Sequence, residues 1–429
     1  MTESVFTYAA PGLKFGRGAS DEIGWDVQQL VATAGGSASR VLLVTDAGVA
    51  ATGHPQRIAQ AMGSNGLDVT LFAGARVEPT DASLEEAIAF ARDCGPFDAV
   101  VAVGGGSSID TAKAVNLLLT NAGELMDYVN PPVGGGRVPE HRLLPLVAVP
   151  TTTGTGAEST TICVLDVLAL KVKTGISHAR LRPTLAVVDP DLTMTQPAMV
   201  TASSGMDILC HALESYTARW FADFEAKRPE QRVPYCGANP IADMWSEKAL
   251  SLLAGAFRRA VGDGSDREAR EQMALAATFA GLGFGNAGVH VPHACAYPIA
   301  GRVRDYRPPG YPDDEPIVPH GMAVVMTAPA AFARTFEASP ERHLRAAELL
   351  GADTRDTADG GSGVLPRVLR GLMRDVGLPS GLGEIGYGSD DVDDLVDGAL
   401  KQQRLLATAP IDVTADDLAT VFRSSLEHW

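Results

Sequence analysis

Cysteine is scarce in this 429-residue chain, and its five copies are scattered with no C-x-x-C pair. That usage argues against a disulfide framework and indicates a reducing compartment. Basic residues are also few, since 35 lysines and arginines stand against 52 acidic residues. The resulting net charge of −17 opposes binding to a phosphate backbone or to an anionic membrane surface. We therefore expect neither a nucleic acid nor a membrane as a partner.

Long apolar runs are lacking as well. No stretch of the sequence reaches the roughly 18 apolar residues that a membrane-spanning helix needs. The first eight residues contain the acidic Glu3 and no apolar segment, which does not fit a secretory signal. Together with the cysteine usage, these absences predict a cytoplasmic protein.

The first half of the chain alternates strand and helix patterns. Strands are predicted over residues 40–46, 67–73, 98–103, 146–149 and 185–188, and helices over 54–62, 81–93 and from the glycines at 104–106 to 119. Such alternation predicts a Rossmann-like parallel sheet with helices on both faces. We expect this α/β domain to span residues 1–195.

The strand patterns fade after about residue 195, and helical spacing takes over. Helices are predicted over residues 249–261, 267–281, 321–336, 340–350, 364–376, 390–406 and 415–425. Two loops, 221–240 and the proline-rich 301–319, interrupt them. We expect residues 196–429 to form an all-helical second domain.

Glycines 104–106 stand between a predicted strand and a predicted helix. At such a junction a phosphate can approach the backbone closely, and the free N–H groups at the start of the helix favour an anion. Ser107 and Asp110 follow in an S-x-x-D pattern, so the alternative is that they only cap the helix.

Two further segments lie at predicted strand ends. The loop 151–158 is rich in threonine and glycine, which suits hydrogen bonding to phosphates or to a carboxamide; the alternative is an ordinary polar turn. Asp46 ends the first predicted strand, where a carboxylate accepts hydrogen bonds from a ribose 2′-OH and favours NAD over NADP. The alternative for Asp46 is a helix cap. Polar loops at the ends of several strands indicate a nucleotide crevice.

Asp207 and His211 are separated by one helical turn in a stretch that is otherwise apolar. Buried polar groups of this kind need a partner, and a metal ion would satisfy both; the alternative is a salt-bridged pair in the core. His293 follows Pro292 at a predicted helix start, and His320 lies between Pro319 and Gly321. One carboxylate and three imidazoles suit Fe²⁺, Zn²⁺ or another borderline divalent ion.

Taken in order, these motifs resemble the iron-containing (group III) alcohol dehydrogenase family. The resemblance covers nearly the whole chain and rests on residues 104–107 with Asp110, 150–158, 205–207 with His211 and Glu214, 293–294, and 319–321. Within the family the chain most resembles the hydroxyacid–oxoacid transhydrogenases, through residues 77–81, 170–173, 210–216, 237–241, 283–290, 297–299 and 340–344.

The resemblance implies a dehydroquinate synthase-like architecture with an NAD-binding domain and a metal-binding domain, assembled as a dimer or larger. The implied metal ligands are Asp207, His211, His293 and His320, with Fe²⁺ as the expected metal and Zn²⁺ as the alternative. The implied NAD contacts are Asp46, Gly105, Gly106, Ser107, Thr151, Thr152, Thr155 and Lys173.

The sequence departs from the family at Tyr297, where many members carry a histidine assigned to a proton relay. Tyr297, His290 or solvent would have to replace it. The mitochondrial presequence expected of animal transhydrogenases is also missing, which reinforces the expectation of a cytoplasmic protein.

The resulting hypothesis is hydride transfer at a metal in a cleft between the domains. The resemblance suggests 4-hydroxybutyrate as donor and 2-oxoglutarate as acceptor, with the reduced cofactor retained. A carboxylate substrate needs a cation, for which Lys113, Arg302 and Arg304 are candidates. The alternative is an NAD-dependent alcohol dehydrogenase or aldehyde reductase that releases NADH. A lyase on the same scaffold would need a cluster of phosphate-binding basic residues, which the region 207–216 lacks.

Overall fold

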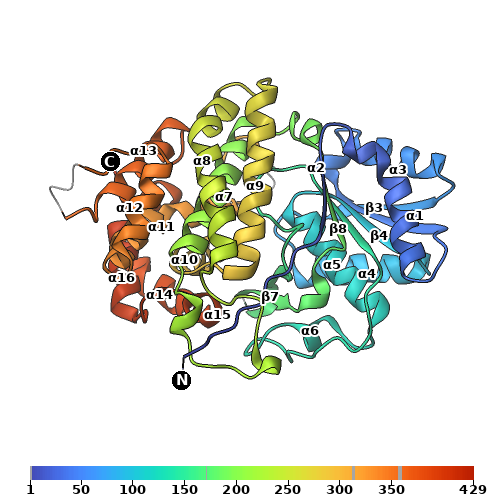
Figure 1. The fold of residues 1–429 in the computed structure, drawn as a ribbon, viewed down its shortest axis with the longest axis horizontal. Coiled ribbons are helices and arrows are strands. Elements are labelled where there is room, and N and C mark those ends of the chain that lie inside the picture. The colour runs from blue at the N-terminus through green and yellow to red at the C-terminus, as the bar shows by residue number, and fades with distance from the viewer. Residues whose placement is uncertain (1, 171, 312–314, 356–359) are drawn as a thin grey trace. The chain divides into compact units, whose positions relative to one another are not determined.

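The computed structural model describes residues 2–170, 172–311, 315–355 and 360–429 (Figure 1). Lys171, in one of the segments that carry the resemblance, and residues 312–314 of the predicted loop 301–319 lie outside the described residues. The chain forms two compact units. The α/β unit comprises Ala10–Thr152 and Gly156–Thr195, and the helical unit comprises Met1–Ala9, Thr153–Thr155 and Gln196–Trp429. The two domains predicted from the sequence, 1–195 and 196–429, differ from this division only in the short segments 1–9 and 153–155.

A six-stranded parallel sheet forms the centre of the α/β unit. In spatial order its strands are β1 (Gly12–Phe15), β8 (Leu185–Val188), β5 (Leu146–Pro150), β4 (Ala99–Gly104), β2 (Arg40–Asp46) and β3 (Asp68–Ala75). The predicted parallel sheet is confirmed, while β1 was not predicted because its four residues carry no continuous apolar pattern.

Helices cover both faces of this sheet, as its strands require. Side chains of the central strands alternate between two apolar clusters, as successive residues of a strand must. One cluster packs against α1 (Ile23–Thr33) and α3 (His54–Ser64), and the other against α4 (Asp81–Cys94) and α5 (Gly106–Thr120).

The direction of the chain connections reverses between the neighbouring strands β2 and β4. The chain leaves β2 toward α3 on one face of the sheet and leaves β4 toward α5 on the other face. Ligands of open α/β sheets bind outside the carboxyl ends of strands at such a point. Asp46 and the glycines at 104–106 lie at the ends of these two strands.

A separate antiparallel hairpin, β6 (Ile162–Val167) and β7 (Val172–Ser177), follows the loop after β5. It was not predicted. Its strands form a two-stranded sheet of their own, and their mixed burial does not give a clean alternation. The unit also contains the short helices α2 (Ala47–Ala50) and α6 (Leu125–Tyr128).

The helical unit packs its helices around one apolar core. In Figure 1, α7, α8 and α9 lie alongside one another. The helices are α7 (Ala198–Thr217), α8 (Pro240–Gly262), α9 (Arg267–Ala287), α10 (Val291–Gly301), α11 (His320–Thr335), α12 (Pro340–Leu349), α13 (Val364–Asp375), α14 (Val392–Leu400), α15 (Gln403–Leu406) and α16 (Ala415–Ser424).

Several helix boundaries differ from the sequence prediction; α9, for example, ends at Ala287 rather than at 281. Helix α8 begins nine residues earlier than its predicted start at 249, because the Asn239 side chain accepts hydrogen bonds from the N–H groups of Ile241 and Ala242 and Pro240 occupies the first helical position. The predicted helix 390–406 is two helices, α14 and α15.

No single helix in the described part of the chain is long and apolar enough to cross a membrane. Helices α9 and α10 meet that test only as a pair bent by 103°, and both belong to the core of the helical unit.

Candidate metal centre and nucleotide-binding loops

Helix α7 carries Asp207, His211 and Glu214 at spacings of four and three residues, which places them on one face. The helix is buried along most of its length, so these polar groups are removed from water: Asp207 is 1% exposed and His211 4%. Their partners come from neighbouring helices rather than from solvent.

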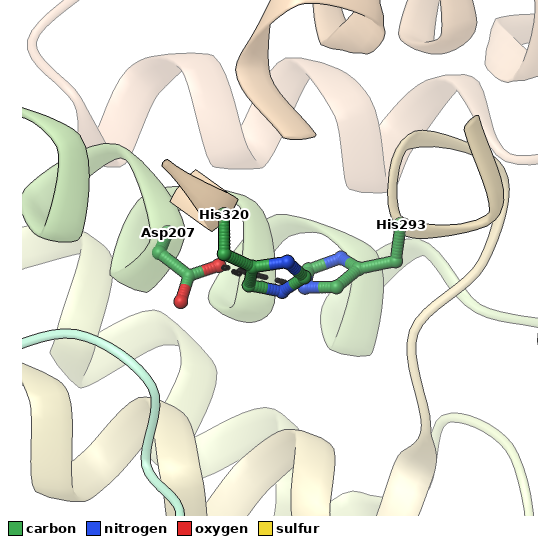
Figure 2. Close-up of side chains that lie close together, drawn as sticks. All are labelled: Asp207, His293 and His320. Carbon is green, nitrogen blue, oxygen red and sulfur yellow. Dashed lines mark ion pairs between the residues drawn. The ribbon is translucent and has the colours of Figure 1, made fainter. Parts of the chain in front are cut away.

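Helices α10 and α11 bring two further imidazoles to Asp207 (Figure 2). Asp207 Oδ1 lies 3.5 Å from His293 Nε2 and 3.9 Å from His320 Nε2. One ligand atom from each of these three residues falls within 4.8 Å of the others. The spacing is too long for strong direct hydrogen bonds and leaves room for a shared ion.

His211 approaches the same carboxylate from within α7. Its Nε2 atom lies 3.7 Å from Asp207 Oδ1. The ring stacks on Phe284 at 3.8 Å between centroids and on His293 at 4.6 Å. The four side chains that the sequence singled out as ligands thus lie around one oxygen of Asp207, although His211 is outside the compact group of three.

A close approach of α11 to α7 places His320. A Cβ atom on Gly321 would lie 2.1 Å from the Ser203 carbonyl oxygen and 2.8 Å from Asp207 Cβ, so only glycine fits there. The Ser203 hydroxyl accepts a hydrogen bond from the Met322 N–H at 3.1 Å. The residue after His320 is therefore packed directly on the helix that carries Asp207.

The chemistry of these residues fits a divalent cation. Asp207 Oδ1 and His293 Nε2 are buried, and neither has a hydrogen-bond partner among the described residues. Burial raises the pKa of Asp207, but the surrounding imidazoles lower it more, to well below its usual range. Burial lowers the pKa of His211 to about 3, so this ring is neutral. An anionic oxygen and neutral imidazoles are the donors that Fe²⁺ and Zn²⁺ prefer.

Glu214, to which the sequence alone assigns no role, is fully buried beside His293. Its Oε2 makes a short contact with His293 Nδ1, and its Oε1 accepts from the N–H of His290 at 2.7 Å and of His293 at 3.2 Å. Burial lowers the pKa of His293, but Glu214 and Asp207 raise it to about 9. A cation bound at Nε2 would replace the second proton of this ring. The sequence does contain one signal for Glu214: Asp207, His211 and Glu214 follow an i, i+4, i+7 spacing, which places them on one face of a helix.

The two candidates for a proton relay occupy different surroundings. His290 is fully buried, its Nε2 lies 3.1 Å from Thr217 Oγ1, and burial lowers its pKa to about 4. Tyr297 lies one turn after His293 in α10 and is 7% exposed. Their roles in proton transfer stay predictions.

Three adjacent strands of the α/β unit end in the predicted nucleotide contacts. The Thr151 N–H donates to the Gly104 carbonyl at 3.0 Å, which joins the loop after β5 to the glycines after β4. A Cβ atom on Gly105 would lie 3.2 Å from Thr152 Oγ1. The Thr151 hydroxyl is buried and has no hydrogen-bond partner among the described residues, and its contact with NAD stays a prediction.

The proposed capping box at Ser107 and Asp110 is wrong. Helix α5 has Gly105 at its N-cap and no side-chain capping hydrogen bond. The Asp110 carboxylate instead accepts from Lys113 Nζ at 3.1 Å and from the Val164 N–H at 2.9 Å, which ties α5 to β6. Ser107 Oγ accepts from the Glu78 N–H at 3.2 Å. The first N–H groups of α5, including that of Gly106, are thus left for an anion.

Asp46 caps a helix and lies beside the glycine loop. One carboxylate oxygen caps α2 by accepting from the Val49 N–H at 2.9 Å, and the other accepts from the Ser108 hydroxyl at 2.9 Å. The helix-capping role is therefore real, and it holds the carboxylate beside the glycine loop. Contact with a ribose stays a prediction.

Lys173 and Thr155 are two further predicted NAD contacts, and both lie outside the loop formed by glycines 104–106. Lys173 is buried and pairs with Glu78 at 2.5 Å and Asp166 at 2.9 Å; burial lowers its pKa, but these carboxylates raise it more. Thr155 belongs to the helical unit with 153–155.

The three candidates for a substrate-binding cation are engaged elsewhere. Lys113 is fully buried, and its ammonium donates to Asp110, to Thr160 Oγ1 at 3.0 Å and to the Ile162 carbonyl at 2.7 Å. Arg302 and Arg304 form surface ion pairs with Asp394 and Asp391. The suggestion that one of them binds the substrate carboxylate is therefore not supported by their contacts.

Comparison with known proteins agrees with this architecture. Residues 11–190 match the family described as iron-containing alcohol dehydrogenase, and residues 230–426 match the C-terminal part of the Fe-containing alcohol dehydrogenase family. Mitochondrial hydroxyacid–oxoacid transhydrogenase of Rattus norvegicus is 44% identical over 432 residues, covering 100% of this chain and 91% of the relative; that of Homo sapiens is 43% identical with the same coverage. The structure of a 1,3-propanediol oxidoreductase aligns with a TM-score of 0.84 at 30% identity, covering 98% of this chain and all of the other.

The expected cytoplasmic location is contradicted by these relatives, whose names place them in mitochondria. The physical reason for the error is that free, scattered cysteines fit any reducing compartment and do not distinguish one from another.

The two family matches together cover most of the chain, and the fold and the full-length relatives agree with them. The chain belongs to the iron-containing alcohol dehydrogenase family and is an enzyme of its metal-dependent, NAD-linked oxidoreductase class.

Proposed function

We propose that this enzyme is a hydroxyacid–oxoacid transhydrogenase that moves hydride from a hydroxy acid such as 4-hydroxybutyrate to a 2-oxo acid such as 2-oxoglutarate. The observation that carries the proposal is the 43–44% identity, over the whole chain, to mammalian proteins of that name. NAD held by the α/β unit would supply the hydride acceptor for the carbinol carbon of one substrate and the hydride donor for the carbonyl carbon of the other.

Asp207, His211, His293 and His320 are proposed to hold the metal. A divalent cation held there would supply Lewis acidity toward the substrate oxygen and so stabilise the charge that develops there. Asp207 contributes the anionic donor, and its burial strengthens its interaction with a cation. Fe²⁺ is the proposed metal and Zn²⁺ the alternative, since this donor set suits both.

The α/β unit is proposed to hold NAD. The uncapped amides at the start of α5 face the pyrophosphate, the Thr151 hydroxyl supplies a further hydrogen bond, and Asp46 accepts from the ribose. Thr152, Thr155 and Lys173 complete the proposed set.

The proton balance of the reaction limits what the relay must do. Oxidation of the donor releases one proton from its hydroxyl, and reduction of the acceptor takes one up, so a single group can take the proton and return it. Tyr297 is the proposed group because it follows His293 by one turn of α10. His290 and solvent are the alternatives.

An NAD-dependent alcohol dehydrogenase that releases NADH is the second candidate. The likeness to the 1,3-propanediol oxidoreductase structure favours it, since that enzyme acts on an uncharged alcohol by name. The two functions use the same proposed residues and differ in whether the reduced nucleotide leaves.

Isotope transfer without added nucleotide separates them. Metal-loaded protein, purified free of external nucleotide, is given 4-hydroxybutyrate deuterated at its carbinol carbon together with 2-oxoglutarate. We expect deuterium at C2 of the 2-hydroxyglutarate product over many turnovers, and none with His293→Ala. Strict dependence on added NAD, with release of NADH, would support the dehydrogenase instead.

A further inference from the structure

Glu214 is a buried carboxylate whose contacts converge on one place. A carboxylate removed from water needs hydrogen bonds or opposite charge to compensate for its lost hydration. The Glu214 contacts that the described residues show all go to the beginning of α10: two backbone N–H groups and one ring nitrogen, those of His290 and His293. Glu214 thus links α7, which carries Asp207, to the helix that carries His293.

The beginning of α10 depends on this outside acceptor. His290 is at the N-cap and its side chain makes no capping hydrogen bond. The first N–H groups of a helix have no partner within the helix, and a negative charge beside them is favourable. Glu214 supplies both the acceptor and the charge from the neighbouring helix. The backbone from which the His293 ring projects is therefore held by Glu214.

The same carboxylate sets which nitrogen of His293 faces Asp207. Nδ1 points at Glu214, and Nε2, which is buried without a hydrogen-bond partner among the described residues, lies 3.5 Å from Asp207 Oδ1. An ionised carboxylate only accepts hydrogen bonds, so Nδ1 carries the proton of this contact and Nε2 is the nitrogen that would bind a cation.

We propose that Glu214 is the positioning residue of the metal centre: it fixes the tautomer and the orientation of His293 and thereby raises metal affinity. This inference rests on the proposed metal site. Carboxylates that orient a ligating histidine change metal affinity by about 10- to 100-fold.

Cobalt(II) binding to metal-free protein tests the inference without an activity assay. Glu214→Gln keeps the side-chain size and one oxygen for the backbone N–H groups, but its amide cannot accept at both positions. We expect its affinity for Co²⁺ and Zn²⁺ to fall about 10- to 100-fold, with a changed visible spectrum of the cobalt form. Unchanged affinity with an unchanged spectrum would overturn the proposal.

A double-mutant cycle separates positioning from general damage to the fold. Because Glu214 acts through His293, Glu214→Gln should cost little more in the His293→Ala background than His293→Ala costs alone. Losses that add in full would overturn the proposal. Glu3→Gln is the matched control, since Glu3 is a buried carboxylate of the same unit that accepts from Arg232 and the Lys227 N–H, and it should leave metal affinity unchanged.

The cobalt comparison and one further measurement keep the outcomes distinct. If wild type and His293→Ala bind cobalt equally, the proposed metal site fails; if only Glu214→Gln equals wild type, the site stands and the role of Glu214 fails. Nitrogen-15 spectra of histidine-labelled, zinc-loaded wild type report the tautomer of His293 directly, whether or not a Glu214 variant folds. With His293→Ala used for assignment, we expect a protonated Nδ1 and a metal-shifted Nε2, and the reverse pattern would refute the assignment.

Discussion

Glu158, in the loop after β5, is 3% exposed, and its burial raises the pKa of its carboxyl to about 7 despite the nearby Lys113 ammonium. The ordinary value is 4.5, so the folded protein holds this proton more tightly than the unfolded chain does. The contribution to stability is complete below pH 4.5 and is lost as the pH rises toward 7. By pH 8 the charged group costs roughly 3 kcal/mol.

Replacing this carboxyl by an amide should therefore change the pH dependence of stability. Glu158→Gln keeps the shape but does not ionise, so we expect the nucleotide-free variant to match wild type near pH 4.5 and to be more stable by roughly 2–3 kcal/mol at pH 8. The thermal unfolding midpoint, measured across this range, checks the expectation. A constant difference between the two proteins at every pH would contradict it.

Asp46 allows a test of nucleotide choice at a single residue. Asp46→Asn keeps an oxygen for the Val49 N–H but removes the charge that disfavours a 2′-phosphate. We expect the preference for NAD over NADP to shrink by about tenfold, or about 1.4 kcal/mol, in equilibrium binding measured by calorimetry. Asp68→Asn, at the exposed beginning of β3, is the matched control and should leave the preference unchanged. An equal loss in both variants would remove Asp46 from the site.

At the scale of elements, the crossing of α7 and α11 fixes where His320 lies. Gly321→Ala would push a methyl group into the Ser203 carbonyl, and backbone atoms cannot yield as a flexible side chain does. We expect metal affinity to fall at least about tenfold and the unfolding midpoint to drop, both measured on purified protein.

Another helical glycine provides the control for this crossing. A Cβ atom on Gly255, on the exposed face of α8, would meet nothing within 4 Å. Gly255→Ala should therefore stabilise the protein by up to about 1 kcal/mol through helix propensity alone and leave metal binding unchanged. Retention of full metal affinity in Gly321→Ala would show that the crossing does not position the ligand.

Local patterns predicted the parts of the fold and the site that depend on neighbours in sequence. An apolar run followed by glycines and a helical pattern predicted β4 and α5. Two polar residues one turn apart in an apolar helix identified Asp207 and His211 as candidate ligands. The partners that complete these sites come from distant segments. The position of Asp110, three residues after Ser107, fits a helix-capping motif. Its actual hydrogen bonds, with Lys113 and with β6, depend on a hairpin whose position no local pattern reveals.

The same reasoning explains why Glu214 was assigned no role. The spacing of Glu214 from Asp207 is visible in the sequence. Its role depends on contacts with the beginning of α10, and His290, which it contacts there, is 76 residues away in sequence. The start of α8 differs from the prediction for a local reason. Asn239 and Pro240 form a helix-start signal, but they lie within the predicted loop 221–240.

At the scale of the whole molecule, helix α7 supports more than the proposed metal ligands. The segment 153–155 belongs to the helical unit, where the Thr153 N–H donates to Gln196 Oε1 at 3.3 Å and Gly154 packs against Ser204. The Gln196 amide in turn donates to the Ser204 hydroxyl at 2.8 Å. Ser204 precedes Asp207 by three residues, so one end of a predicted nucleotide loop rests on the first turns of the metal-binding helix.

Hydrogen exchange can follow this connection. Removing the metal from the holoenzyme leaves Asp207 and the histidines without their shared partner, so we expect faster amide exchange in α7, in the first turns of α10 and α11, and in 153–155. Strands β2 and β4 belong to the other unit and should keep their protection. His293→Ala, treated in the same way, should show little difference between metal-added and metal-free samples. A uniform change across both units would mean that the metal stabilises the chain as a whole, whereas unchanged exchange in 153–155 would mean that the loop is independent of the metal-binding helix.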